Sequence, residues 1–517
     1  MRPANRVVVN TGFLYGKMLI TMLISLYSTR LILNALGAVD YGIFNLVGGV
    51  IAMLSFLNGA MSVATQRYLS FYLGAGEKHK LKSVFNSSIV LHLVIGFIIV
   101  LLLEFGGLLL FNGTLNIPAD RIGVAKIVFH FMVISTFFTI NAVPYDAAIN
   151  THENFLFDAL TGIFESIIKL GIAIWLIYTE VDKLILYGAL IAGLTIIIRI
   201  IKSIYCFRKY EECRVRLTSY FDTGLLKEMF SFAGWNLFGS FCSVISNQGI
   251  AIVLNLFFGI IVNAAYSIAT QVNGQLSSFS INMLKALNPQ IVKSEGSGDR
   301  ERMLRLAILA CKLSFFLIAF FAIPIVLEMP FILNLWLKTV PDNTIIFCQL
   351  ILILSLVQQL TVGMMSALFS VGKIKVYQIV VGSLLMFNLP IAYILLKFGL
   401  PAYSVFVGSI FLEIIAGCSR IWFAHKIAGL HIHNFISGTL FKSMSSASLV
   451  ILFTLLPHFL LQEGILRTTL TAITSTILLL FFGRYIALTS DEHEKIKELI
   501  LAFCIKARNI FKFTNDC

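Results

Sequence analysis

The sequence is short of charged residues. Only 13% of its 517 residues are Asp, Glu, Lys or Arg, whereas 58% are hydrophobic and 45 are phenylalanine. A typical soluble domain has about a quarter of its residues charged, and the mean hydropathy of this chain is +0.90. The composition therefore excludes an ordinary soluble enzyme and predicts an integral membrane protein.

Several chemical signatures are also missing. The eight cysteines are scattered, with no CxxC pair and no His/Cys spacing suited to zinc, so we predict neither a disulfide framework nor a metal site. No GxxxxGK[ST] motif is present to support ATP hydrolysis, and we expect no cofactor. The polar connections on the predicted exterior side are short, so we nominate no catalytic residue. The net charge of +13 is the sole feature in favour of nucleic acid, and we expect no such partner.

Long apolar runs dominate what is present. Windows of about 20 apolar residues, the length that crosses a bilayer, recur about fourteen times, and the first is too long for a signal peptide. Most of the 39 Lys and Arg residues fall on one side if Met1 is cytoplasmic, which predicts an all-α polytopic protein with both termini inside. We expect an N-terminal lobe at 1–225, a C-terminal lobe at 226–430, two further spans at 431–490 and a basic amphipathic cytoplasmic tail at 491–517.

The first two lobes look like copies of each other. A shift of 222 residues places Gly37 on Gly259 and Gly76 on Gly298, and it superposes the two six-span blocks. The glycine loops "LGAGEK" and "EGSGDR" then become equivalent cytoplasmic turns, not phosphate-binding loops. Because each follows an even number of spans, we expect a parallel repeat with two six-helix bundles facing a central cavity.

The N-terminal third resembles a known family. The first span ends in "YSTR", and the segments "LNALGAVDYGIFN" and "GAMSVATQRYLS" follow it. These features are similar to bacterial polysaccharide-transport proteins, the Wzx-type lipid-linked oligosaccharide flippases of the multidrug/oligosaccharidyl-lipid/polysaccharide (MOP) superfamily. The resemblance implies two lobes that work by alternating access, with spans 13 and 14 outside the core. It carries no fixed catalytic motif.

Two basic residues lie in the first span. Lys17 and Arg30 are thirteen residues apart, which places them within about 10° of a common helix face. One interpretation is that this face lines the cavity and binds the diphosphate of a polyprenyl-linked sugar. The other is that both side chains reach towards the two membrane surfaces.

Further intramembrane polar groups extend the set of candidates. Glu165 and Lys169 are one turn apart in the favourable order for an ion pair, so they form either a structural pair or an ion-coupling site. Amides are frequent in spans 7 and 8, and a hydrated, sugar-facing wall and interhelical hydrogen bonding are both open explanations for them. The nominated amides are Asn236, Asn247, Gln248 and Gln271.

These features favour transport over chemistry. The first hypothesis is a flippase in the bacterial inner membrane that translocates polyprenyl-diphosphate-linked oligosaccharide for O-antigen, capsule or exopolysaccharide assembly. It would be coupled to H⁺, Na⁺ or the membrane potential, and other polysaccharide-assembly proteins would be its partners. A multidrug exporter of the MATE type is the alternative, although Lys17 and Arg30 would repel cationic drugs. A membrane-embedded O-antigen polymerase is a third hypothesis, disfavoured by the short outer loops.

Overall fold

The computed structural model describes residues 3–52, 55–111, 117–337 and 340–487, and this part of the chain is helical and contains no strand. The tail expected at 491–517 lies outside the described residues. The chain divides into two compact units, one formed by Asn10–Leu237 and the other by Phe238–Cys517 together with Met1–Val9. Each unit is described by itself below.

The helices have the length and composition of membrane spans. Within the described residues, 11 helices are long and apolar enough to cross a bilayer, or 12 if a pair bent by 42° counts as one span. The all-α polytopic architecture is therefore confirmed. The second and eighth of the expected fourteen spans fall on the helical segments that follow Gly37 and Gly259, and these segments are not among the 11.

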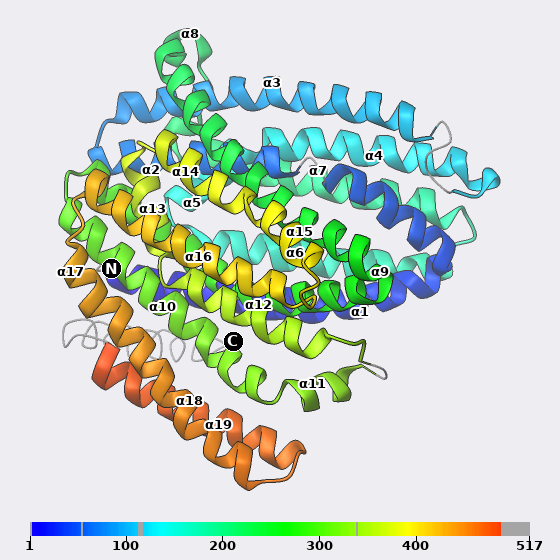
Figure 1. The fold of residues 1–517 in the computed structure, drawn as a ribbon. Coiled ribbons are helices and arrows are strands. Elements are labelled where there is room, and N and C mark those ends of the chain that lie inside the picture. The colour runs from blue at the N-terminus through cyan, green and yellow to red at the C-terminus, as the bar shows by residue number, and fades with distance from the viewer. Residues whose placement is uncertain (1–2, 53–54, 112–116, 338–339, 488–517) are drawn as a thin grey trace, which may run out of the picture. The chain divides into compact units, whose positions relative to one another are not determined.

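The unit Asn10–Leu237 contains the first six expected spans. Helices α3 and α4 run side by side in it (Figure 1). Its helices are α1 (Pro3–Ala52) from Asn10 onward, α2 (Ser55–Ala75), α3 (Lys78–Phe111), α4 (Ile122–Asn141), α5 (Val143–Thr151), α6 (Phe155–Trp175), α7 (Lys183–Lys209), α8 (Leu217–Tyr220) and the start of α9 (Thr223–Gly296), with 3-10 turns at Ala119–Arg121, Leu176–Tyr178 and Glu211–Cys213.

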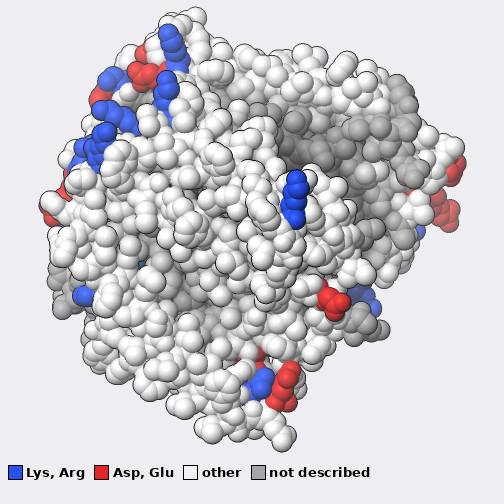
Figure 2. Space-filling view, in the orientation of Figure 1, with Lys and Arg blue, Asp and Glu red and all other residues white. Residues whose placement is uncertain are grey.

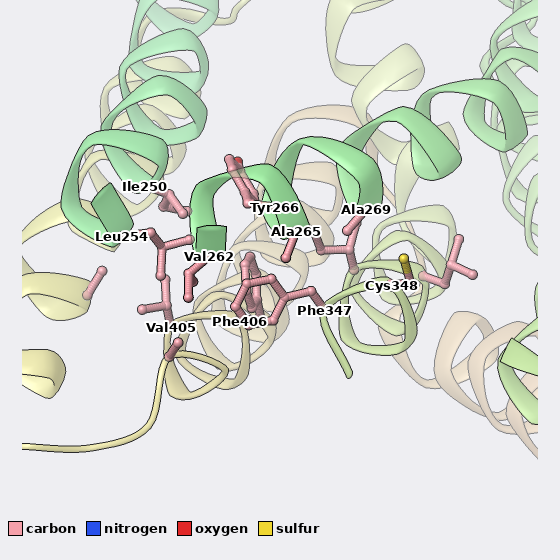
Figure 3. Close-up of a cluster of buried hydrophobic side chains, with 14 of the residues drawn as sticks. Ile250, Leu254, Val262, Ala265, Tyr266, Ala269, Phe347, Cys348, Val405 and Phe406 are labelled. Carbon is pink, nitrogen blue, oxygen red and sulfur yellow. The ribbon is translucent and has the colours of Figure 1, made fainter. Parts of the chain in front are cut away.

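The second unit contains most of α9 and the remaining spans. Its other helices are α10 (Arg300–Leu327), α11 (Met329–Trp336), α12 (Thr344–Gln359), α13 (Val362–Val371), α14 (Lys375–Met386), α15 (Asn388–Lys397), α16 (Ser404–Phe423), α17 (Ile432–Phe435), α18 (Lys442–Leu460) and α19 (Ile465–Phe482), with π-helical turns at Ala424–Ala428, Ile436–Phe441 and Gly483–Ala487. Figure 3 shows part of its core, where Leu254, Tyr266, Phe347 and Phe406 pack together.

Glycines that the 222-residue shift superposes adopt matching backbone conformations. Gly37 breaks α1 at φ 76°, and Gly259 breaks α9 at φ 77°. Gly76 and Gly298 have φ 73° and 78°, and the helices that follow them begin at Lys78 and Arg300. Because side chains with a Cβ are strained at such φ values, glycine fixes the same breaks and turns in both copies. This agreement supports the repeat expected from the sequence.

The two glycine turns also share a hydrogen-bonding pattern. The N–H of Glu77 donates to the carbonyl of Tyr72, and that of Asp299 donates to the carbonyl of Ser294. A hydrogen bond from a backbone N–H to the carbonyl five residues earlier, next to a glycine with positive φ, is the Schellman motif that ends many helices. The turn is thus a helix stop used once in each copy.

Figure 2 shows Lys and Arg side chains gathered near α8 on a face that is otherwise mostly uncharged.

Candidate functional site

Five ionisable side chains meet inside the unit Asn10–Leu237. They come from four helices: Lys17 from α1, Asp146 from α5, Asp158 from α6, and Arg199 and Lys202 from α7. We call them the charge cluster. Ionised groups in or beside membrane spans are costly unless they are paired or solvated, so a cluster of this kind indicates compensation, function or both.

Asp158 lies between two lysines. Lys17 Nζ donates to Asp158 Oδ2 at 3.1 Å, and Lys202 Nζ donates to Asp158 Oδ1 at 3.0 Å. The side chains of Asp158 and Lys202 are 7% and 9% exposed, whereas that of Lys17 is 26% exposed. The carboxylate is therefore held by one buried and one accessible cation.

Asp146 extends the cluster to Arg199. Lys202 Nζ donates to Asp146 Oδ1 at 2.9 Å, and Arg199 Nη1 donates to Asp146 Oδ2 at 3.2 Å. The Nε of Arg199 is buried and has no hydrogen-bond partner among the described residues, so the guanidinium keeps a donor that its protein neighbours do not use.

Local sequence explains how these groups converge. Pro144 opens α5, where its missing N–H is harmless, and Asp146 follows in the first turn of that helix. Asp158 likewise lies in the first turn of α6, so both carboxylates lie near helix N-termini, which favour negative charge. Arg199 and Lys202 are three residues apart on α7 and share one face. Helix starts and helix spacing together place the acids opposite the bases.

The cluster carries one positive charge in excess when all five groups are ionised, since three bases face two acids. Lys17 and Arg199, whose side chains are 26% and 23% exposed, are the more accessible cations. A guanidinium and an ammonium in this arrangement can bind an anion, the first through two N–H bonds and the second as a point charge.

Gly162 makes room for Lys17. A Cβ at Gly162 would lie 2.3 Å from Lys17 Cε, a distance that no unstrained structure keeps. The side chain of Lys17 therefore passes α6 at Gly162, where the absence of a Cβ leaves space for its Cε.

Lys17 and Arg30, the two basic residues nominated in the first span, have different surroundings. Lys17 belongs to the charge cluster. Arg30 is exposed on α1 and has no ion pair or hydrogen bond with the part of the chain that the structure describes. The expected common cationic face thus consists of one engaged and one free side chain within these residues.

Glu165 and Lys169 form the ion pair that their spacing predicts. Lys169 Nζ lies 2.6 Å from Glu165 Oε1, and the two side chains are 41% and 25% exposed, respectively. Both lie on α6, beyond Asp158, and no contact between this pair and the charge cluster is recorded among the described residues.

The nominated amides divide into one buried and three exposed residues. Asn236 is buried and donates to the carbonyl of Ala60 at 3.2 Å, which is interhelical hydrogen bonding. Asn247, Gln248 and Gln271 are exposed along α9. Exposed amides at these positions are compatible with a polar wall.

Two buried acids of the second unit, Glu413 and Glu328, are paired with bases. Arg420 donates to Glu413 Oε1 at 2.5 Å and to Thr361 Oγ1 at 3.1 Å. Glu328 is fully buried and accepts from His458, Arg467 and Thr471 at 2.9, 2.8 and 3.2 Å. The second network joins the end of α10 to α18 and α19.

The sequence pattern did not single out Asp146, Asp158, Arg199 or Lys202. The two acids stand at predicted span ends, and the two bases had been assigned to a cytoplasmic connection. A usable signal was present: both acids fall within the first turn of a helix that follows a break, and the two bases share a face of the next span.

Comparison with known proteins adds the fold class. No family model matches the chain, and no curated protein is similar to it in sequence. Among solved structures, it is similar to an outward-facing MATE-family multidrug resistance transporter of the MOP superfamily, with a TM-score of 0.72 and 14% identity over 83% of this chain and 96% of that one.

Two other solved structures have a similar fold. A MATE transporter in its straight conformation gives a TM-score of 0.71 at 15% identity, over 83% of this chain and 96% of that one. A MOP superfamily transporter from Pyrococcus furiosus, described by a binding pocket of reverse polarity, gives 0.67 at 12% identity over 84% and 99%. The chain therefore has the fold that these MATE and MOP superfamily transporters share.

Proposed function

We propose that the protein is a flippase for polyprenyl-diphosphate-linked oligosaccharide. The observation that carries this proposal is the positive excess of the charge cluster, in which Lys17 and Arg199 are the accessible cations. The barrier to moving such a lipid is the transfer of a hydrated, anionic head group through hydrocarbon. Cations fixed inside a span lower that barrier, and no covalent step is required.

The proposal extends to the biological setting. The resemblance of the first spans to polysaccharide-transport proteins supports a bacterial inner-membrane location and a role in O-antigen, capsule or exopolysaccharide assembly. Asn247, Gln248 and Gln271 would face the glycan, and Glu165 with Lys169 would couple transport to H⁺ or Na⁺. Other polysaccharide-assembly proteins would receive the product.

A MATE-type exporter of cationic drugs is the second candidate, because the similar solved structures include multidrug transporters. The charge cluster disfavours it. A cationic drug would meet three basic groups and two acids that are already paired, and like charges at short range repel.

Reconstitution separates the two candidates. Purified protein in liposomes is given a fluorescent polyprenyl-diphosphate oligosaccharide in one leaflet, and its appearance in the other leaflet is followed by quenching. We expect transport by the wild type, loss of transport in a Lys17→Met, Arg199→Met double variant, and little change in Lys126→Met, which removes an exposed cation outside the cluster. Export of ethidium without lipid transport would favour the exporter.

Arg30 provides a cellular test. We expect Arg30→Ala to abolish surface polysaccharide at normal protein abundance and Arg30→Lys to retain part of it, because the first removes the anion contact and the second keeps the charge. Normal polysaccharide in the alanine strain would exclude an essential contact at Arg30.

A further inference from the structure

The second unit contains an apolar groove between α9 and α15. Its volume is about 490 Å³, and its walls include Ile252 and Val253 of α9 and Leu389 and Ile394 of α15. All the residues that line it are in the unit Phe238–Cys517. Ile252 and Ile394 are 62% and 49% exposed, so the groove opens outward.

Specific residues shape the groove. A Cβ at Gly249 would lie 2.5 Å from Leu389 Cδ1, so the glycine allows the leucine to lie directly on the backbone of α9. The helix breaks between α14 and α15, and Pro390 occupies the first turn of α15. Together α14 and α15 form one candidate span, Lys375–Lys397, so the groove lies beside a local break within this span.

Buried hydrogen bonds hold the break in place. Asn388 Nδ2 donates to Ser246 Oγ at 3.2 Å, and Ser409 Oγ donates to Asn388 Oδ1 at 3.0 Å. All three side chains are buried. These bonds tie α15 to α9 and α16, so the groove is a fixed feature of the fold. Its floor continues into the core of Figure 3, to which Val253 and Leu254 belong.

The lining selects hydrocarbon. Apart from the Tyr393 ring, which packs edge-on against Phe257 at 5.4 Å, the residues around the groove have aliphatic side chains or none. The walls present only apolar surface, so a polar ligand would lose its hydration without compensation, whereas an alkyl or isoprenoid chain would not.

Polar amides adjoin the groove on α9. Gln248 precedes Gly249 and lies one turn before Ile252, and Asn247 is exposed beside it. Gln248 is eleven residues from the end of its span at Gly259, roughly 16 Å of helix rise. A resident phospholipid keeps its head group at the membrane surface and would place acyl chain against these amides. A lipid in transit places its polar head there and its tail in the groove.

We propose that this groove binds the polyprenyl chain of the lipid-linked substrate while α9 faces its polar head. The proposal rests on the proposed function. Filling the groove would therefore weaken lipid binding without altering the charge cluster, which belongs to the other unit.

Photolabelling tests the assignment. Wild-type protein in nanodiscs is exposed either to a polyprenyl diphosphate with a diazirine near the chain terminus or to phosphatidylglycerol with a diazirine in an acyl chain, and labelled peptides are mapped. Ile252→Trp and Ile394→Trp fill the groove from its exposed side. Leu256→Trp is the control, because Leu256 is one turn further along α9, is 70% exposed and does not line the groove.

We expect the polyprenyl probe to label the groove in wild type and in Leu256→Trp. In the two filling variants we expect roughly tenfold weaker labelling, the loss that follows from expelling about two methylenes. Equal labelling by phosphatidylglycerol that competes with the polyprenyl probe, or labelling that the tryptophans leave unchanged, would overturn the proposal.

The liposome assay separates this proposal from the proposed function. If wild type translocates the lipid-linked oligosaccharide and the filling variants retain both transport and labelling, the groove assignment fails and the flippase stands. If wild type does not translocate that lipid, the proposed function fails whatever the labelling.

Discussion

Two lysines that bind the same carboxylate should have different roles. Lys17 and Lys202 both contact Asp158, at 3.1 and 3.0 Å, but their side chains are 26% and 9% exposed. Lys202 also contacts Asp146 at 2.9 Å. We predict that Lys202→Met chiefly reduces stability and that Lys17→Met chiefly reduces substrate binding.

The structure sets the size of the difference. Removing one partner of a buried ion pair costs about 3 to 5 kcal/mol, because the remaining charge is left in a poorly solvated site. Lys202→Met leaves Asp146 and Asp158 with fewer cations. Lys17→Met leaves Asp158 bound to Lys202, and because Lys17 is partly solvated its pair contributes no more than about 1 kcal/mol.

Thermal unfolding in nanodiscs measures the first effect. For a unit of this size, 3 to 5 kcal/mol corresponds to a fall in Tm of roughly 6 to 20 °C, and 1 kcal/mol to roughly 2 to 4 °C. Adding Asp146→Asn to Lys202→Met should restore part of the loss, because it removes one unpaired charge. Titration with polyprenyl diphosphate measures the second effect, and there Lys17→Met should be the weaker binder.

Gly162→Ala provides a variant that moves a charge without removing it. The new methyl group would collide with Lys17 Cε, and the flexible lysine would move away from Asp158. We expect Tm close to that of wild type and reduced binding of polyprenyl diphosphate. An equal fall in Tm for Lys17→Met and Lys202→Met, or unchanged binding in both Lys17→Met and Gly162→Ala, would refute this division of roles.

Three further predictions concern the ends and breaks of the helices. Arg121 bonds Asp182, which caps α7. Burial opposes ionisation of Asp182, but the hydrogen bond and charge of Arg121, together with the backbone N–H groups of Leu184 and Ile185, outweigh it and lower the pKa of Asp182 below its ordinary value. The pair therefore stabilises the fold above that ordinary value and loses its effect as pH falls through the lowered pKa, so Tm measured from pH 7 to pH 3 should fall on acidification in wild type and vary less in Arg121→Met. Gly37→Ala and Gly259→Ala should each cost about 1 to 3 kcal/mol, because both positions have φ values suited to glycine; a negligible change in Tm at either would contradict the shared break. Glu328→Gln should expose α18 and α19 to faster hydrogen exchange, since it removes the charge that Arg467 pairs with, and unchanged exchange would show that these helices are held by apolar contacts alone.

Features controlled by single residues were predictable from the sequence. Gly37, Gly76 and their partners 222 residues later were identified as a repeat from spacing alone, and their φ values agree because glycine acts on the local backbone. The i,i+4 pair of Glu165 and Lys169 was predictable for the same reason. Apolar length likewise predicted helices that cross a membrane.

The charge cluster was not predictable in this way. Lys17, Asp158 and Lys202 come together through the packing of α1, α6 and α7. The periodicity of a single span does not predict which of its faces packs against which other helix. A second obstacle was that the sequence does not show how deeply a charged residue near a span end is buried. Arg199 and Lys202 lie near the end of the span Lys183–Lys209 and were counted with the connection that follows it, although Lys202 is buried.

Two arginines, one in each copy of the repeat, are paired differently, although the 222-residue shift places Arg199 on Ile421. Arg199 in α7 and Arg420 in α16 each lie sixteen residues after the first residue of their helix, Lys183 and Ser404. Arg420 pairs with Glu413 of its own helix, so that pair moves with α16 as one body. Arg199 instead pairs with a carboxylate of another helix, α5.

This difference determines which copy can respond to helix movement. A displacement of α5 or α6 against α7 changes the distances from Asp146 and Asp158 to Arg199 and Lys202, and buried ion pairs are sensitive to such changes because little water compensates them. The Glu413–Arg420 distance is fixed by the rise of one helix. An anion that binds Lys17 and Arg199 competes with Asp158 and Asp146 for these cations, and it thereby loosens contacts between helices. On the proposed function, we therefore expect binding and helix movement to be linked in the first copy of the repeat, through the same five side chains.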